Sequence, residues 1–117
     1  MYIKLDQLSP VEAVLLPVGR LDVESAPLVR QAILDLVEKG ITALVLDLSH
    51  VEFVDSSGLS VFVSGMKALR RSGGRLAICN ANPQVHTALR LTMLEQIFPN
   101  HASAEDAFHW LESSPIE

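Results

Sequence analysis

The sequence is poor in cysteine. Its 117 residues include a single thiol, Cys79. The chain therefore cannot form an internal disulfide, which fits a reducing compartment such as the cytosol. Cys79 closes the apolar run 75–79, which is typical of a strand. We expect a buried, unreactive thiol there rather than a redox-active one.

Positive charge is also scarce. Nine Lys and Arg residues stand against fourteen Asp and Glu residues, which gives a formal net charge of −5. Nucleic-acid binding needs clustered basic side chains. Only Arg70 and Arg71 are adjacent, at the predicted end of a helix, where they complement the helix dipole. We therefore expect no nucleic-acid partner.

Long apolar runs are missing as well. No stretch approaches the roughly 20 residues that a helix needs to span a bilayer. Residues 1–6 lack the basic-then-apolar layout of a signal peptide. These features predict a soluble, cytoplasmic protein without membrane insertion.

Patterns that carry catalysis or metal binding are not found. The chain has no Gly-x-Ser-x-Gly nucleophile elbow and no Gly-x-x-x-x-Gly-Lys phosphate loop. Its four histidines show no metal-ligand spacing, and scattered surface histidines are the commoner explanation for them. We expect no enzymatic activity, no catalytic residue, no metal site and no cofactor.

What the sequence does contain is apolar residues, at 49% of the chain. That fraction is ample for a packed core, and the length suits one domain over residues 1–117. Strands are predicted at 2–8, 13–18, 41–48, 76–79 and, weakly, 96–98. Pro17 in the second strand predicts a sheet edge or a bulge.

Four helices alternate with these strands. The first follows Ser25 as its expected cap, and an apolar stripe defines its inner face: Leu28, Ala32, Ile33, Leu36 and Val37. The second runs from Ser56 to Arg71, the third follows a cap at Asn82, and the last opens at Ser103 and should fray at 113–115. The order predicts an α/β fold with a mixed, mostly parallel sheet that begins with an antiparallel hairpin.

The most informative segment lies at the start of the second helix, where two hydroxyls and a carboxylate occupy the first turn: Asp55, Ser56, Ser57, Gly58 and Leu59. The positive end of a helix dipole favours negative charge, so a phosphate would be accommodated there. Asp and Ser are also preferred N-cap residues, and for these five residues alone simple capping is the commoner explanation.

The longer segment 47–59 resembles the signature of STAS domains, and within them the bacterial anti-sigma factor antagonists. Their pattern is a strand ending in Asp-Leu, a short linker, an apolar pair, and then Asp-Ser-Ser-Gly-Leu opening a helix. The resemblance extends to the turn 19–22 and to 71–74 before the next strand. It covers nearly the whole chain.

The resemblance implies a phosphorylation-switched regulator. In that family the unmodified protein binds a serine kinase that is also an anti-sigma factor, and so releases a sigma factor. Phosphorylation ends the complex, and a PP2C-type phosphatase restores the antagonist. The family's modified serine maps to Ser56, and less well to Ser57. The residues implied in partner binding are Arg20, Asp22, Asp55, Ser57, Gly58, Leu59 and Ser60.

Two positions depart from the family pattern. Arg20 stands where Glu is common, which reverses a charge on the docking surface, and Ser60 stands where Gly is common. At Gly58, a larger side chain is expected to weaken docking while leaving the fold mostly intact. The alternative function is a structural STAS subunit without a regulatory phosphate, such as the accessory protein of a bacterial lipid-transport ABC complex. Neighbouring genes for a sigma factor or a transporter would distinguish the two.

Overall fold

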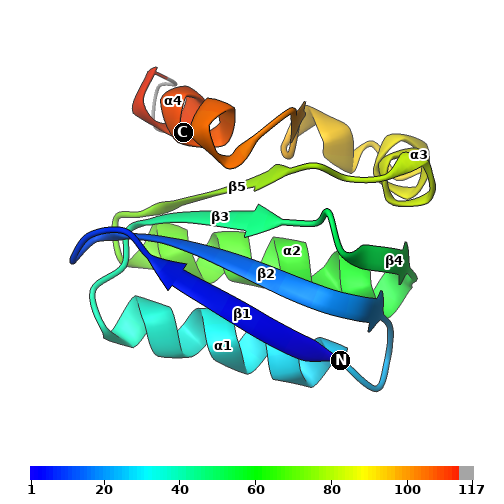
Figure 1. Ribbon diagram of the computed structural model, residues 1–117, viewed down its shortest axis with the longest axis horizontal. Coiled ribbons are helices and arrows are strands. Elements are labelled where there is room, and N and C mark those ends of the chain that lie inside the picture. The colour runs from blue at the N-terminus through cyan, green and yellow to red at the C-terminus, as the bar shows by residue number, and fades with distance from the viewer. Residues whose placement is uncertain (114–117) are drawn as a thin grey trace.

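The computed structural model describes residues 1–113, and the fraying predicted for Ser114 and Pro115 lies outside them. A central sheet takes the strands in the order β1-β2-β3-β5-β6, with β4 beside β2 (Figure 1). The strands are β1 (Tyr2–Gln7), β2 (Glu12–Leu21), β3 (Ala43–Asp47), β4 (Val51–Val54), β5 (Arg75–Cys79) and β6 (Asn100–His101).

The pairing of the strands confirms the predicted fold class. β1 and β2 are antiparallel, and every other pair in the sheet is parallel. The helices are α1 (Ala26–Glu38), α2 (Ser56–Arg71), α3 (Pro83–Leu91) and α4 (Ala104–Ser113), with a 3-10 turn, η1, at Leu94–Gln96.

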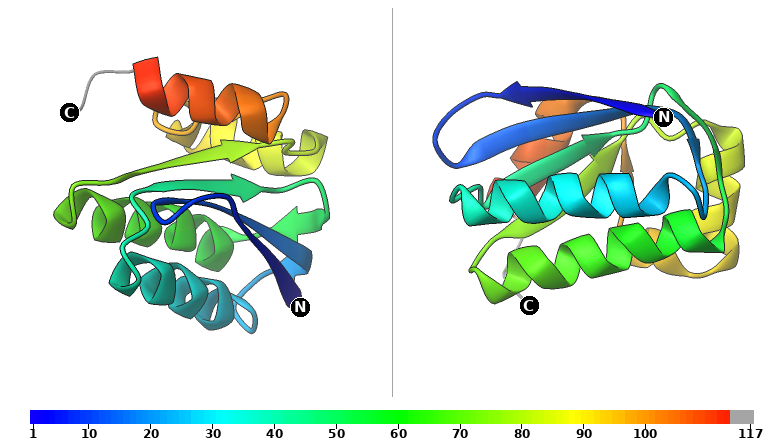
Figure 2. Two further views of the ribbon diagram at one scale, coloured as in Figure 1. Left: turned by 60° about the vertical axis from the view of Figure 1, so that its left-hand side comes forward. Right: turned by 90° about the horizontal axis from the view of Figure 1, so that it is seen from below.

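The helices lie on both faces of the sheet. α1 and α2 run side by side on one face (Figure 2). Phe62 and Leu69 of α2 are fully buried in the main core there. On the other face, α4 places Ala107 and Leu111 over Val45 of β3 and Cys79 of β5. α3 packs beside β4, at the edge of the sheet. The sheet therefore separates two apolar clusters, the main core beneath α1 and α2 and a smaller one beneath α4.

β2 changes its neighbour along its length, and this accounts for Pro17. The strand pairs with β3 through Glu12–Leu15 and with β4 through Gly19–Leu21. Pro17 falls in the gap between the two registers. The N–H of Gly19 donates to His50 O, so the odd-numbered residues of β2 direct their backbone groups toward β3 and β4. Pro17 has no N–H to direct there, and at its position no bond between the strands requires one. Pro17 therefore does not lie at a sheet edge, and the irregularity in the strand falls two residues later, where the register of β2 against β4 shifts between Gly19 and Arg20.

Three other expectations are wrong. Leu28 is 50% exposed, and Val29 takes its place in the buried stripe of α1. Ser25 precedes α1, but its side chain makes no capping bond. Residues 96–98 form no strand, because the chain turns through η1 and buries Phe98, and the last strand follows Pro99.

Candidate functional site

Asp55 begins α2 as a true N-cap. Its backbone is extended, and its carboxylate accepts the Gly58 N–H at 3.0 Å. Its own N–H donates to Leu21 O, at 3.3 Å, and thereby ties the helix start to the end of β2. The capping interpretation is therefore confirmed for Asp55, and the two serines that follow are not needed for it.

Three hydroxyls surround this helix start, and they differ in accessibility. Ser56 is exposed, and its hydroxyl has no hydrogen bond to any residue in the described range. Ser57 is half-buried. Ser60 is exposed, but its hydroxyl donates to Ser57 O at 2.6 Å. Of these three residues, only Ser56 is both exposed and without a hydrogen bond at its hydroxyl within residues 1–113.

Gly58 and Leu59 are buried and point into the fold rather than to the surface. A Cβ added at Gly58 would overlap Leu21 O and lie 2.5 Å from Cγ2 of Val54. Any side chain would thus separate α2 from β2 and β4. The expectation that Gly58→Val leaves the fold mostly intact is wrong for this reason.

The turn between β2 and α1 forms the second part of the site. The Asp22 carboxylate accepts the N–H groups of Glu24, at 3.1 Å, and Ser25, at 3.2 Å. Ser25 Oγ donates to Arg20 O and accepts the Asp22 N–H, at 2.7 and 3.0 Å. The bond from the Ser25 backbone is the main reason that the pKa of Asp22 lies below its usual value. Ser25 therefore locks this turn instead of capping the helix.

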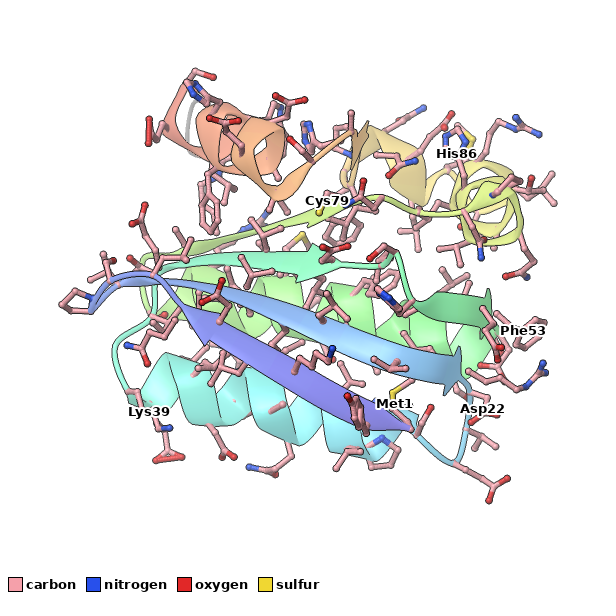
Figure 3. All side chains as sticks on the ribbon, in the orientation of Figure 1. Met1, Asp22, Lys39, Phe53, Cys79 and His86 are labelled. Carbon is pink, nitrogen blue, oxygen red and sulfur yellow. The ribbon has the colours of Figure 1, made fainter. Side chains whose placement is uncertain are left out.

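Arg20 connects this turn to β4. Its guanidinium lies 4.2 Å from the centroid of the Phe53 ring, and its Nε is 3.9 Å from Asp22 Oδ2. Figure 3 shows Asp22 and Phe53 at the same end of the molecule, opposite Lys39. Because Leu21 pairs with Val54, this turn and the start of α2 meet at that end. We call the exposed or half-buried residues of this surface the switch end: Arg20, Asp22, Phe53, Asp55, Ser56, Ser57 and Ser60.

Sequence reasoning missed the part of the site that β4 and α3 supply. The family pattern presents residues 51–54 only as the end of a linker and an apolar pair, although Val51, Phe53 and Val54 are strand-favouring residues. The outer edge of β4 is covered by amide side chains. Gln84 accepts the Val54 N–H at 3.0 Å and donates to Val54 O at 3.3 Å, and Asn82 donates to Val51 O at 3.0 Å. The Asn82 cap of α3 is confirmed as well, since it accepts the Val85 N–H.

Away from the switch end, the groups to consider are the single thiol and the metal-ligating side chains of residues 1–113. Cys79 is buried, and desolvation, followed by the charge of Asp47, raises its pKa to about 12. Among residues 1–113, no group of three or more His, Cys, Asp or Glu side chains is arranged to hold a metal. No described helix is both long enough and apolar enough to cross a membrane.

Comparisons with known proteins identify the class. The family model of the STAS domain matches residues 2–107. The anti-sigma F factor antagonist of Paenibacillus polymyxa is 33% identical over 95 residues, which cover 80% of this chain and 81% of that protein. The chain therefore belongs to the STAS domain family. Within that family it is similar to the anti-sigma factor antagonists.

Solved structures agree with this assignment. An anti-sigma factor antagonist from Mycobacterium paratuberculosis has a TM-score of 0.83 at 28% identity, covering 96% of this chain and 94% of that one. Unphosphorylated SpoIIAA, an anti-sigma factor antagonist, has a TM-score of 0.82 at 21% identity, covering 98% and 100%. The phosphorylated form from Bacillus has a TM-score of 0.71, covering 92% and 97%. At that identity SpoIIAA shows a common fold alone.

Proposed function

We propose that this protein is an anti-sigma factor antagonist that is switched by phosphorylation of Ser56. Unmodified, it binds an anti-sigma factor serine kinase in the cytoplasm and releases a sigma factor. Phosphorylation ends that binding, and a PP2C-type phosphatase restores it. Residues 1–117 act as one binding domain without catalysis of their own.

The exposed, unengaged hydroxyl of Ser56 at the first turn of α2 carries this proposal. A kinase must reach the hydroxyl, and no internal bond has to break first. Ser57 is half-buried, and Ser60 already donates to a backbone carbonyl, so both are poorer acceptors of a phosphate. The exposure and the hydrogen bonding of the three serines therefore support Ser56 as the modified residue.

Charge explains how a phosphate at Ser56 acts as a switch. It brings about −1.5 to −2 charges next to the Asp55 carboxylate. The α2 dipole and the free N–H groups of a helix start accommodate that charge within the fold. A partner surface formed for the neutral serine does not accommodate it. The change is therefore felt mainly by the partner and needs little refolding.

The remaining partner-binding residues fall into two groups. Arg20, Asp22, Asp55, Ser57 and Ser60 keep exposed or half-buried side chains at the switch end, where a kinase can contact them. Gly58 and Leu59 support that surface from beneath, because both are buried. The Arg20 side chain is 58% exposed, so we expect the kinase to carry an acidic group opposite it.

Phosphorylation by the cognate kinase tests the proposal directly. Incubation with kinase and Mg-ATP should add one phosphate, and peptide mapping should place it on Ser56. Ser56→Ala should remain unmodified, whereas Ser64→Ala, in the middle of α2, should be modified like the wild type. Phosphate persisting on Ser57 or Ser60 would reject the residue assignment. No phosphate from any cognate kinase, together with no kinase binding, would favour the structural STAS subunit.

A further inference from the structure

Strand β1 leaves one edge of the sheet open. It is the first strand in the sheet order, and five of its six residues are exposed. The hydrogen bond from Leu8 N to Glu12 O shows that even-numbered residues direct their backbone groups toward β2. By alternation, the N–H and C=O groups of Ile3, Leu5 and Gln7 point away from the sheet. Three residues are thus ready to pair with another strand.

The side chains of this edge are self-complementary. We propose that β1 pairs with β1 of a second copy of this chain, antiparallel and centred on Leu5. That register joins Leu5 to Leu5 and Ile3 to Gln7 through their outward backbone groups. It also places Lys4 opposite Asp6 twice, once on each side of the two-fold axis.

The charges select this register over its neighbours. Only shifts of two residues keep the outward backbone groups in register. Centring on Lys4 would bring two lysines together, and centring on Asp6 would bring two aspartates together. Centring on Leu5 gives opposite charges, and within the described residues neither Lys4 nor Asp6 has an ion-pair partner of its own.

Exposed apolar side chains fit the same arrangement. Tyr2 is 54% exposed and Leu8 is 52% exposed. They flank the charged pair on the same face of the strand, and the proposed register sets Tyr2 of one copy opposite Leu8 of the other. Aromatic–aliphatic and opposite-charge pairs both stabilise antiparallel strands. Each cross-strand pair of this face is therefore complementary.

A charge-swap cycle tests the pairing by sedimentation velocity, from about 10 µM to about 1 mM protein. The wild type should shift from monomer to dimer with concentration. Lys4→Glu and Asp6→Lys should each weaken the dimer about tenfold or more, and the double variant should recover to within about threefold of the wild type. Lys39→Glu, which makes the same charge change on an exposed residue outside β1, is the matched control.

A disulfide tests the register. Leu5→Cys should cross-link two copies under mild oxidation, because paired Cα atoms about 5.5 Å apart are within disulfide range. Ile3→Cys should not, since the Cα atoms of its two copies would lie about 14 Å apart. A wild type that stays monomeric at every concentration, a double variant that does not recover, or a loss as large in Lys39→Glu would overturn the proposal. Cross-linking of Ile3→Cys rather than Leu5→Cys would also overturn it.

Discussion

At position 56, charge and hydroxyl can be separated by substitution. Ser56→Ala removes a hydroxyl that has no hydrogen bond in the described structure, so it should keep kinase binding and block phosphorylation. Ser56→Asp adds a negative charge beside Asp55, and it should bind the kinase at least about tenfold more weakly, a loss of about 1.4 kcal/mol. Calorimetry with the kinase measures both affinities.

The stability of the same two variants provides the control. Asp55 already caps α2, and an acidic first turn is favourable, so both variants should melt close to the wild type. Equal affinity of the two variants for the kinase would contradict an electrostatic switch. Weak binding combined with early melting in both would instead show that Ser56 supports the fold.

Single residues were predictable to the extent that their roles are local. The Asp55 cap and the place of Ser56 at the helix start follow from residue types alone, and both are present in the structure. The burial of Gly58 does not, because the group that it must approach, Leu21 O, is 37 positions away in sequence. The bond from Ser25 to Arg20 O was likewise hidden, since a serine before a helix normally caps it.

At the scale of elements, α3 holds β4 through a side chain instead of a strand. Gln84→Ala removes both bonds to Val54 and should lower the free energy of unfolding by about 1 kcal/mol. Gln31→Ala is the control, because it removes the same amide from a helix and that amide bonds only to Asp35 on the exposed surface of α1. Urea unfolding of both variants decides; equal small effects would show that the β4 edge does not need the amide.

Longer elements were predicted more successfully than shorter ones. α2 and the first hairpin carry enough periodic residues to define themselves, whereas β4 and β6 have four and two residues. Such short strands exist because neighbouring strands and α3 hold them, which a local pattern does not record. The shift of the α1 stripe from Leu28 to Val29 has a similar origin, since the packing of α1 on α2 decides which residues are inside.

At the scale of the whole molecule, labelling of Cys79 can report whether the helices on the two faces of the sheet open together or separately. Its pKa of about 12 keeps the native thiol protonated near pH 8, and α4 covers it, so modification by a thiol reagent should require opening of the structure. Leu111→Ala loosens α4 directly, whereas Leu36→Ala opens a cavity in the main core on the opposite face.

We therefore expect Leu111→Ala to raise the Cys79 labelling rate at least about fivefold more than Leu36→Ala, once both rates are compared at equal stability in urea. That excess would show that α4 undocks without global unfolding. Equal rates at equal stability would mean that the two clusters open together, and would contradict separate opening of α4.

The overall arrangement was the most predictable level. Alternating strands and helices after a hairpin indicated a mixed sheet with helices on its faces, and the structure has that order. The meeting of the 19–22 turn with the start of α2 was not available from local patterns. It depends on the change of partner of β2, which pairs with β3 before Pro17 and with β4 after it, and such a change is a property of the whole sheet.

The amide side chains along the outer edge of β4 have a consequence for the selectivity of partner binding. Asn82 and Gln84 occupy the place where an approaching chain could otherwise add a strand to this end of the sheet. Strand addition draws its affinity from main-chain bonds, which every sequence can supply. With that route closed, the proposed kinase would have to recognise the switch end through side chains such as Arg20 and Ser56. In a cell that contains several related signalling pairs, a covered β4 edge would limit crosstalk at the switch end, because a mismatched regulator could not bind there through the backbone of β4.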